Sequence, residues 1–222
     1  MKKKLIQEFD GITEYNIKVI YNGVDTQKFS PKNKMYQNKY FPELKDISCP
    51  KILFLSRWSA RKGIKYLMEA IKILNNTLDL HFIIAGPNQK NMEEKQIENC
   101  TFLGYTDEKK IPTLYSIADI FILPSLYENF PISLLEAMAS GSAVIGTKVG
   151  GIPEMINHGQ NGLLINPRRT DEIVNSITTL IKNENLRKKI SENAIIAVEK
   201  RFSWEKIALE TKLNYEKILQ NG

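Results

Sequence analysis

Short apolar runs recur along the chain and are separated by polar turns. Several runs are apolar at every position, as in Ile120–Leu123, which is typical of parallel strands covered on both faces. The pattern predicts strands at Lys18–Tyr21, Ile52–Leu55, His81–Ala85, Thr101–Leu103, Ile120–Leu123, Ala143–Gly146 and Leu163–Ile165.

Between these runs, apolar residues recur at intervals of three and four, the spacing of an amphipathic helix. Two such stretches are Tyr66, Leu67, Ala70, Ile71 and Leu74, and Ile173, Ile177, Leu180 and Ile181. Alternating strands and helices of this length predict βαβ units and a parallel, doubly wound α/β sheet. In such sheets ligands bind beyond the carboxyl ends of the strands, so chemistry is expected in the loops that follow them.

Both ends of the chain depart from this alternation. From about Asp171 onward the pattern is helical, with a break where Ser203 is expected to N-cap a final helix that reaches about Gln220. Residues 1–16 show no clear strand and are expected to form a helical or irregular lead-in. The polar segment Lys32–Lys45 is expected to form a mobile loop. Residues 1–222 are expected to form one domain.

The composition is that of an ordinary globular protein. Of 222 residues, 42% are hydrophobic and 25% are charged. Cys49 and Cys100 are far apart without metal-ligand spacing, which favours incidental thiols of a cytoplasmic protein. Polar residues interrupt the start of the chain, so no signal peptide is expected, and no run approaches the roughly 18 apolar residues of a membrane span.

The formal net charge of +6 suits an anionic partner. A nucleotide-sugar, anionic lipid headgroups at the inner face of the membrane, and nucleic acid all have the required charge. Basic residues are not interleaved with aromatic ones, so nucleic acid is not expected, whereas peripheral contact with an anionic membrane stays open.

Two or three cations lie in the turn after Ile52–Leu55, which reads Ser56-Arg57-Trp58-Ser59-Ala60-Arg61-Lys62-Gly63. A helix N-terminus offers unpaired amides and partial positive charge, so Arg57 and Lys62 could complete a clamp for a diphosphate. On this segment alone, a solvated basic loop is the simpler explanation.

The segment after Ile120–Leu123 carries two glutamates eight positions apart. Pro131 suits a first helical turn, where its missing N–H costs nothing. Glu128 is then in the loop and Glu136 is one to two turns inside the helix. One carboxylate can face a sugar and the other a ribose, with the first-turn amides facing phosphate. The bare spacing is equally compatible with a surface helix and solvated acids.

The segment as a whole resembles the E-x7-E motif of family 4 (group 1) glycosyltransferases, and Arg57 and Lys62 match the family's Arg-x4-Lys pair. Further matching segments follow in the family's order: Val19–Asp25, Phe29–Pro31, Phe82–Gly86, Phe102–Tyr105, Ala118–Ser125, Gly150–Glu154, Asn161–Leu164 and Phe202–Trp204. The resemblance covers about Lys18 to Leu219. It implies a single Rossmann-like domain, the C-terminal half of a GT-B fold.

The resemblance also implies a reaction: retaining transfer of a hexose-type sugar from a UDP- or GDP-sugar to a glycan or lipid-linked acceptor, without a metal or other cofactor. Arg57, Lys62 and the first-turn amides would stabilise the departing diphosphate. Glu136 would hold the ribose and Glu128 the sugar. The base would pack near Gly104–Thr106. The implied donor-binding residues are Arg57, Lys62, Gly104, Tyr105, Glu128, Asn129, Phe130, Pro131, Ile132 and Glu136, with Glu128, Arg57 and Lys62 also catalytic.

This chain departs from the family pattern in two ways. Ser56 stands where glycine is usual, and Asn129 and Pro131 stand where Glu-Gly-Phe-Gly is common, so the donor preference stays open. The family's N-terminal acceptor-binding domain has no counterpart here. The chain is expected to need that domain in cis or in trans, with residues 203–222 packing on it, and to be inactive alone. The alternative is a non-catalytic binding or regulatory module.

Other candidate residues are expected to be structural. His81 begins an apolar strand, and His158 lies in a turn. The pair Gly150-Gly151 is either a simple turn or, by resemblance, a loop near the donor. The sequence contains no Asp-x-Asp and no P-loop, so it indicates no metal-dependent phosphate site. No Gly-x-Gly-x-x-Gly follows a strand, which argues against a dinucleotide dehydrogenase.

Overall fold

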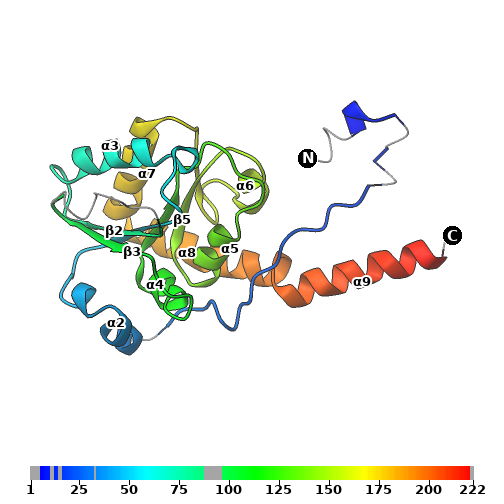
Figure 1. Cartoon of the computed structure of the whole chain (residues 1–222), viewed down its shortest axis with the longest axis horizontal. Coiled ribbons are helices and arrows are strands. Elements are labelled where there is room, and N and C mark those ends of the chain that lie inside the picture. The colour runs from blue at the N-terminus through cyan, green and yellow to red at the C-terminus, as the bar shows by residue number, and fades with distance from the viewer. Residues whose placement is uncertain (1–5, 11–12, 15–16, 33, 88–96, 221–222) are drawn as a thin grey trace.

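Parallel strands form a single six-stranded sheet with the order β3-β2-β1-β4-β5-β6 (Figure 1). It belongs to a computed structural model that describes residues 6–10, 13–14, 17–32, 34–87 and 97–220. The first strand lies at the centre, so the chain winds outward to β3 and then crosses back to wind outward to β6. This is the doubly wound Rossmann-like topology that the sequence predicts.

The strands are β1 Lys51–Leu55, β2 His81–Ala85, β3 Cys100–Gly104, β4 Ile120–Leu123, β5 Ala143–Thr147 and β6 Leu163–Ile165. The α-helices are α2 Lys34–Tyr40, α3 Ile64–Leu74, α4 Ile111–Ile117, α5 Ile132–Ala139, α6 Ile152–Met155, α7 Thr170–Lys182, α8 Glu184–Arg201 and α9 Trp204–Gln220. Two short 3-10 helices are η1 Pro42–Leu44 and η2 Ala60–Lys62. The six strands predicted from Ile52 onward agree with these bounds to within one residue.

Alternate residues of the central strands face opposite layers of helices. Ile52 and Phe54 of β1 pack in the cluster with α3 and α7, whereas Leu53 packs with α4 and α5. All three side chains are fully buried. Figure 1 shows α3 and α7 on one side of the sheet and α4 on the other. Burial on both faces explains why these strands are continuous apolar runs.

The predicted strand at Lys18–Tyr21 is wrong. The segment has no regular secondary structure and lies outside the sheet, and Val19 and Ile20 are exposed. It runs beside α9 instead, where Lys18 Nζ lies 3.0 Å from Glu210 Oε1. β-branched residues favour extended backbone, but a strand also needs a neighbour to pair with, and the sequence pattern does not reveal one.

The predicted loop at Lys32–Lys45 is also wrong, because the described part of this segment contains α2 and η1. Phe41 and Leu44 are buried in the core and anchor the segment despite its polar composition. The predicted lead-in is described only in part: residues 6–8 form a helical turn, and residues 1–5, 11–12 and 15–16 lie outside the described residues. Residues 88–96, between β2 and β3, also lie outside them.

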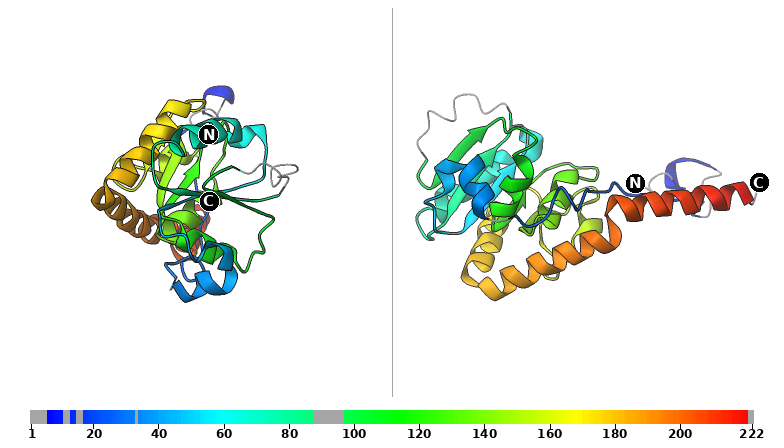
Figure 2. Two further views of the ribbon diagram at one scale, coloured as in Figure 1. Left: turned by 90° about the vertical axis from the view of Figure 1, so that its left-hand side faces the viewer. Right: turned by 90° about the horizontal axis from the view of Figure 1, so that it is seen from below.

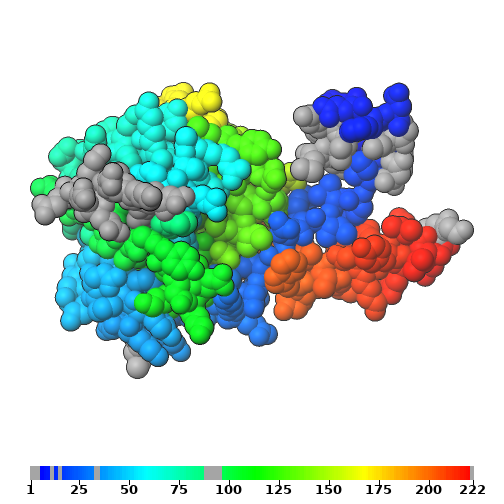
Figure 3. Space-filling model, in the orientation of Figure 1, coloured from blue at the N-terminus to red at the C-terminus, as the bar shows by residue number. Residues whose placement is uncertain are grey.

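The chain enters and leaves the sheet region at one point. Val24 N donates to Phe202 O at 2.9 Å, and Trp204 N donates to Val24 O at 3.2 Å. We call this pairing the Val24 clasp. Ser203 Oγ accepts from Lys206 N at 3.3 Å, so Ser203 N-caps α9 as predicted. Figures 2 and 3 show α9, in orange and red, standing away from the body of the domain.

Candidate functional site

The loops after β1 and β4 meet where the winding direction of the sheet reverses. β1 pairs in parallel with both β2 and β4, and the register places Leu53 opposite Phe121. The two strands lead to helices on opposite faces, which is the arrangement in which ligands bind beyond the carboxyl ends of the strands. Both loops that the sequence singles out lie at this usual ligand position of open α/β sheets.

Gly63 holds these two loops in contact. It has φ of +71° at the start of α3, and an added Cβ would lie 1.8 Å from the carbonyl oxygen of Pro124 in the β4–α5 loop. Leu126 N also donates to Arg61 O at 2.7 Å. Glycine is therefore required here both by the left-handed backbone and by the close approach. The side chain of Arg61 is exposed, as expected for a solvated neighbour of the clamp.

Lys62 and Glu128, two of the residues expected at the site, form a direct ion pair. Lys62 Nζ lies 2.6 Å from Glu128 Oε1, and the Ser125 hydroxyl donates to the same oxygen at 2.7 Å. Thr147 steadies this loop, because its hydroxyl donates to the carbonyl of the buried Ser125 at 2.6 Å. Both contacts to the carboxylate use Oε1, so Oε2 is the oxygen through which Glu128 can accept a ligand hydroxyl.

Glu136 lies in the second turn of α5 and is largely buried. The Tyr115 hydroxyl, from α4, donates to Glu136 Oε2 at 3.0 Å. Burial raises the pKa of Glu136, while the hydrogen bond from Tyr115 and the charge of Lys28 oppose the rise. The two glutamates therefore stand where the sequence predicts, with Glu128 in the loop and Glu136 inside the helix.

The loop after β5 closes over the backbone of Glu128 and Asn129. Gly151 N donates to Asn129 O at 2.6 Å. Gly150 has φ of +55°, and a Cβ there would lie 1.8 Å from Glu128 O. Of the two alternatives for these glycines, the loop beside the candidate site is the one that the structure supports.

The residues that follow Glu128 lead from the β4–α5 loop into α5. Phe130 stacks on Tyr21 with ring centroids 5.0 Å apart. Pro131 is the N-cap of α5, one residue before the first-turn position that the sequence predicts. Ile132 begins the helix and is exposed. Leu134 N donates to Pro131 O at 3.1 Å. The amides of Ile132 and Ser133 before it have no acceptor within the helix by helix geometry and can serve an anion.

Three further predicted residues lie at the carboxyl edge of the sheet. Arg57 is in the β1–α3 loop with an exposed side chain. Gly104 ends β3 with φ of +60°, and Tyr105 follows it with an exposed ring. β3 is two strands away from β1, at the same carboxyl edge of the sheet.

Two contact residues of the site do not stand out in the sequence. Ser125 lies three positions before Glu128, so its hydroxyl is a candidate partner once that glutamate is selected. Tyr115 lies in an apolar helical pattern and is indistinguishable there from an ordinary core residue. Its role becomes visible only when α4 and α5 are placed side by side.

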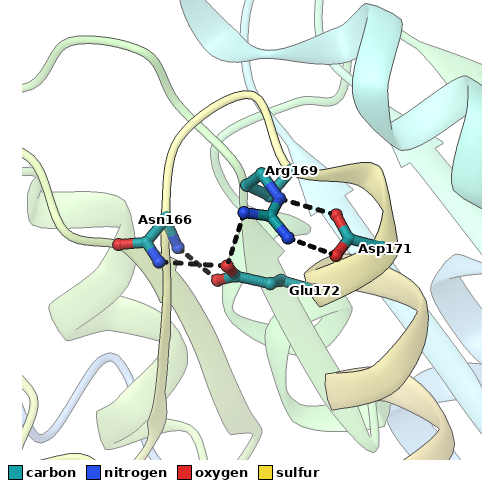
Figure 4. Close-up of polar contacts among 4 residues, drawn as sticks. All are labelled: Asn166, Arg169, Asp171 and Glu172. Atoms are coloured by element: carbon teal, nitrogen blue, oxygen red, sulfur yellow. Dashed lines mark hydrogen bonds and ion pairs between the residues drawn. The ribbon is translucent and has the colours of Figure 1, made fainter.

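A second group of charges lies at the same edge of the sheet, in the turn between β6 and α7 (Figure 4). Arg169 Nη2 lies 2.6 Å from Asp171 Oδ2, and Asn166 N donates to Glu172 Oε2 at 2.7 Å. The hydrogen bond from Arg169 lowers the pKa of Asp171 to about 2. These exposed charges satisfy one another at the start of α7, so we assign this group to the helix N-terminus rather than to a ligand.

The two histidines are in structural positions, in keeping with the sequence. His81 Nε2 lies 2.8 Å from Thr101 Oγ1, and burial lowers the pKa of His81. Leu164 N donates to His158 Nδ1 at 2.9 Å. Within the described residues, no group of three or more His, Cys, Asp or Glu side chains could hold a metal ion. The helices of the described part also include none with the length and apolar character to cross a membrane.

The parallel sheet and the loops at its switch point define a Rossmann-like α/β domain of the GT-B C-terminal type. The sequence of this domain, including both loops at the switch point, matches a known family. The model of the family described as glycosyl transferases group 1 matches residues 37–196, and the chain belongs to this family.

Individual relatives agree with this assignment. The chain is 32% identical to an uncharacterized glycosyltransferase of Methanocaldococcus jannaschii, over 89% of this chain and 53% of the relative. The solved C-terminal domain of a group 1 glycosyl transferase, LpcC of Francisella tularensis, is 30% identical with a TM-score of 0.71, covering 82% of this chain and 100% of that one.

A third similar protein, HepE of Anabaena, has been solved in complex with UDP-glucose. It is 25% identical with a TM-score of 0.82, over 97% of this chain and 61% of HepE. The chain spans about half the length of the curated relatives that it matches.

Proposed function

We propose that this domain binds a nucleoside diphosphate sugar and serves in retaining transfer of a hexose-type sugar, without a metal ion or other cofactor. The observation that carries the proposal is the pairing of Lys62 with Glu128 at the switch point, in a chain of a glycosyltransferase family. Lys62, which we propose to serve the diphosphate, and Glu128, which we propose to serve the sugar, lie 2.6 Å apart.

In this proposal the diphosphate lies between Arg57, Lys62 and the first-turn amides of α5. Negative charge grows on the diphosphate as the glycosidic bond breaks, and fixed donors aimed at that charge stabilise the transition state. Glu136 accepts hydrogen bonds from the ribose, and the base packs near Gly104 and Tyr105. The UDP-glucose complex of HepE supports UDP and UDP-glucose as the first ligands to test.

Lys62 does not have to release Glu128 in order to bind phosphate. An ammonium group has three donors, so one can stay on Glu128 Oε1 while the others reach phosphate oxygens. Glu128 then presents Oε2 to the sugar, where a carboxylate stabilises an oxocarbenium-like centre. Ser125 holds the carboxylate in this orientation through its 2.7 Å hydrogen bond.

Transfer to a glycan or lipid-linked acceptor is proposed to need an acceptor-binding unit, in cis or in trans, that packs against α9. Supporting this, Trp204, Leu213 and Tyr215 are 49%, 55% and 65% exposed on α9, and an open groove of about 470 Å³ follows the helix. Exposed apolar surface of this kind marks an interface. A cytoplasmic location, with peripheral contact to an anionic membrane through the +6 net charge, belongs to the same proposal.

Calorimetric titration with UDP and with UDP-glucose, with and without EDTA, tests the donor site. We expect binding that EDTA does not change, and a loss of about 10- to 100-fold in Lys62→Ala, because a hydrogen bond to a charged group contributes about 1.5–3 kcal/mol. Arg61→Ala is the matched control, since that side chain is exposed, and it should change binding much less. Affinity that collapses on chelation would contradict the metal-free clamp.

A radiolabelled donor assay with pooled lipid and glycan acceptors tests the need for an acceptor-binding unit. The purified chain is expected to give no transfer, because holding two reactants in register contributes about 7–11 kcal/mol to catalysis. Robust turnover by a verified monomer of these residues would overturn this part of the proposal.

A further inference from the structure

Tyr115 is a core residue whose hydroxyl the core does not require. Its ring is 1% exposed and makes edge-on contacts with Phe29 and Phe121, at centroid distances of 6.0 and 5.4 Å. A phenylalanine would fill this space equally well. The hydroxyl donates to Glu136 Oε2 at 3.0 Å, so the extra oxygen serves Glu136.

We propose that Tyr115 is a positioning residue that orients Glu136 and keeps its carboxylate charged, so that Oε1 can accept from the ribose of a bound nucleotide. This inference rests on the proposed function, in which Glu136 holds the ribose. By fixing Oε2, the hydrogen bond from Tyr115 restricts rotation of the carboxylate. In this role Tyr115 contacts Glu136, and Glu136 contacts the ligand.

The surroundings of Glu136 explain why such help is needed. Its burial disfavours the charged form and raises its pKa. Among the described residues, the groups that oppose this rise are the Tyr115 hydroxyl from α4 and the ammonium of Lys28, which lies in the segment before α2. The side chain of Lys28 is exposed, so solvent screens its charge more than it screens the buried hydrogen bond.

Tyr115 itself stays protonated over the relevant pH range. Burial, followed by the charge and the hydrogen bond of Glu136, raises the pKa of its hydroxyl well above the usual value. The hydroxyl therefore remains a donor while Glu136 titrates. The carboxylate accepts strong, charge-assisted hydrogen bonds only when ionised, so nucleotide binding should weaken as the pH falls through the pKa of Glu136.

The first test measures the pKa of Glu136 without any ligand, from the 13C shift of its carboxyl carbon during an NMR titration. In Tyr115→Phe the midpoint is expected to rise by about one pH unit or more, since a hydrogen bond to a charged group and one pKa unit correspond to similar free energies. Tyr21→Phe is the matched control: it removes a phenol hydroxyl that donates to Glu154 at 2.7 Å and should leave the midpoint unchanged. An unchanged midpoint in Tyr115→Phe would overturn the inference.

The second test measures UDP affinity by calorimetry from pH 8 to pH 5. Tyr115→Phe is expected to bind UDP somewhat more weakly than the parent protein at pH 8, because the carboxylate is less well oriented. Its further loss of affinity on acidification is expected to begin at a higher pH than that of the parent protein. An equal loss at every pH would show a merely structural role and overturn the inference. If the NMR midpoint rises but UDP affinity in both proteins is independent of pH, the positioning role stands and the ribose assignment of the proposed function fails.

Discussion

Two ion pairs at the carboxyl edge of the same sheet have the same length and different surroundings. Lys62–Glu128 and Arg169–Asp171 both measure 2.6 Å, but the side chains of the first pair are 15% and 9% exposed and those of the second 54% and 57%. Exposed pairs are screened by water and salt and contribute little. Distance alone therefore does not distinguish the two pairs, whereas the burial of their side chains does.

The buried pair also depends on the backbone around it, while the exposed pair needs only its own turn. Glu128 is held between the β1–α3 loop, through Lys62, and the loop after β5, through Gly150. Arg169 and Asp171 are two residues apart in one turn (Figure 4). Changes in distant loops should disturb the first pair and leave the second intact.

The largest effect is expected from Gly150→Ala. Its Cβ would lie 1.8 Å from Glu128 O at a φ of +55°, so the loop that carries Glu128 must move. We expect a loss of about 2–4 kcal/mol in the free energy of unfolding by urea, from overpacking and the left-handed backbone together, and weaker binding of UDP-glucose.

Gly159→Ala is the matched control for this change. Gly159 has a φ of +76° but nothing within 4 Å of an added Cβ, so only the backbone cost of about 1–2 kcal/mol applies. Equal losses of stability in the two variants would mean that Gly150 does not hold the Glu128 loop.

A medium effect is expected from removing one member of the buried pair. Glu128→Ala leaves Lys62 without its partner and should lower the free energy of unfolding by about 1–3 kcal/mol. It should spare free UDP and weaken UDP-glucose, whereas Glu136→Ala should weaken both, because the ribose is common to the two ligands. Calorimetry with each ligand measures this split, and equal losses for both ligands in both variants would reject the division of roles.

A double-mutant cycle compares the two pairs directly. Lys62→Met combined with Glu128→Gln should show a coupling energy of about 0.5–3 kcal/mol in urea unfolding. The same cycle with Arg169→Met and Asp171→Asn should show a smaller coupling energy in moderate salt, since that pair is exposed and screened. Similar coupling in both cycles would remove the distinction between the pairs.

The smallest effect is the acid dependence of the exposed pair. The pKa of Asp171 is lowered from 3.8 to about 2, so its contribution to stability is present above the unfolded value and is lost as the pH falls toward about 2. The difference in unfolding free energy between the parent protein and Asp171→Asn should therefore be small at pH 7 and should shrink further in acid. A difference that grows in acid would contradict this sign.

Most of the fold could be predicted from the sequence, because buried parallel strands are apolar on both faces and need no partner to be recognised. Lys18–Tyr21 shows where this logic fails: Val19 and Ile20 have strand propensity, but pairing depends on a neighbour that composition does not specify. The prediction of a loop at Lys32–Lys45 is wrong for the opposite reason: the segment is polar overall, but Phe41 and Leu44 are enough to anchor it in the core.

The candidate site, like the fold, could be predicted only in part from the sequence. The loops that carry Lys62 and Glu128 could be predicted, since the carboxyl ends of strands and the family motif both point to them. Their contact with each other and with Ser125 could not, because it depends on how two loops meet in space. The role of Tyr115 could not be recognised from the sequence, because a buried tyrosine that donates its hydroxyl to a neighbour occupies the same position in the apolar pattern as a phenylalanine.

The Val24 clasp joins the segment that leads into the domain to the start of α9. A body held by one flexible linker can swivel about every axis of rotation. Here the incoming segment and the start of α9 are joined to each other by two hydrogen bonds of 2.9 and 3.2 Å. Because the two segments are held to each other at this point, a unit packed against α9 would turn relative to the domain mainly about the Val24 clasp.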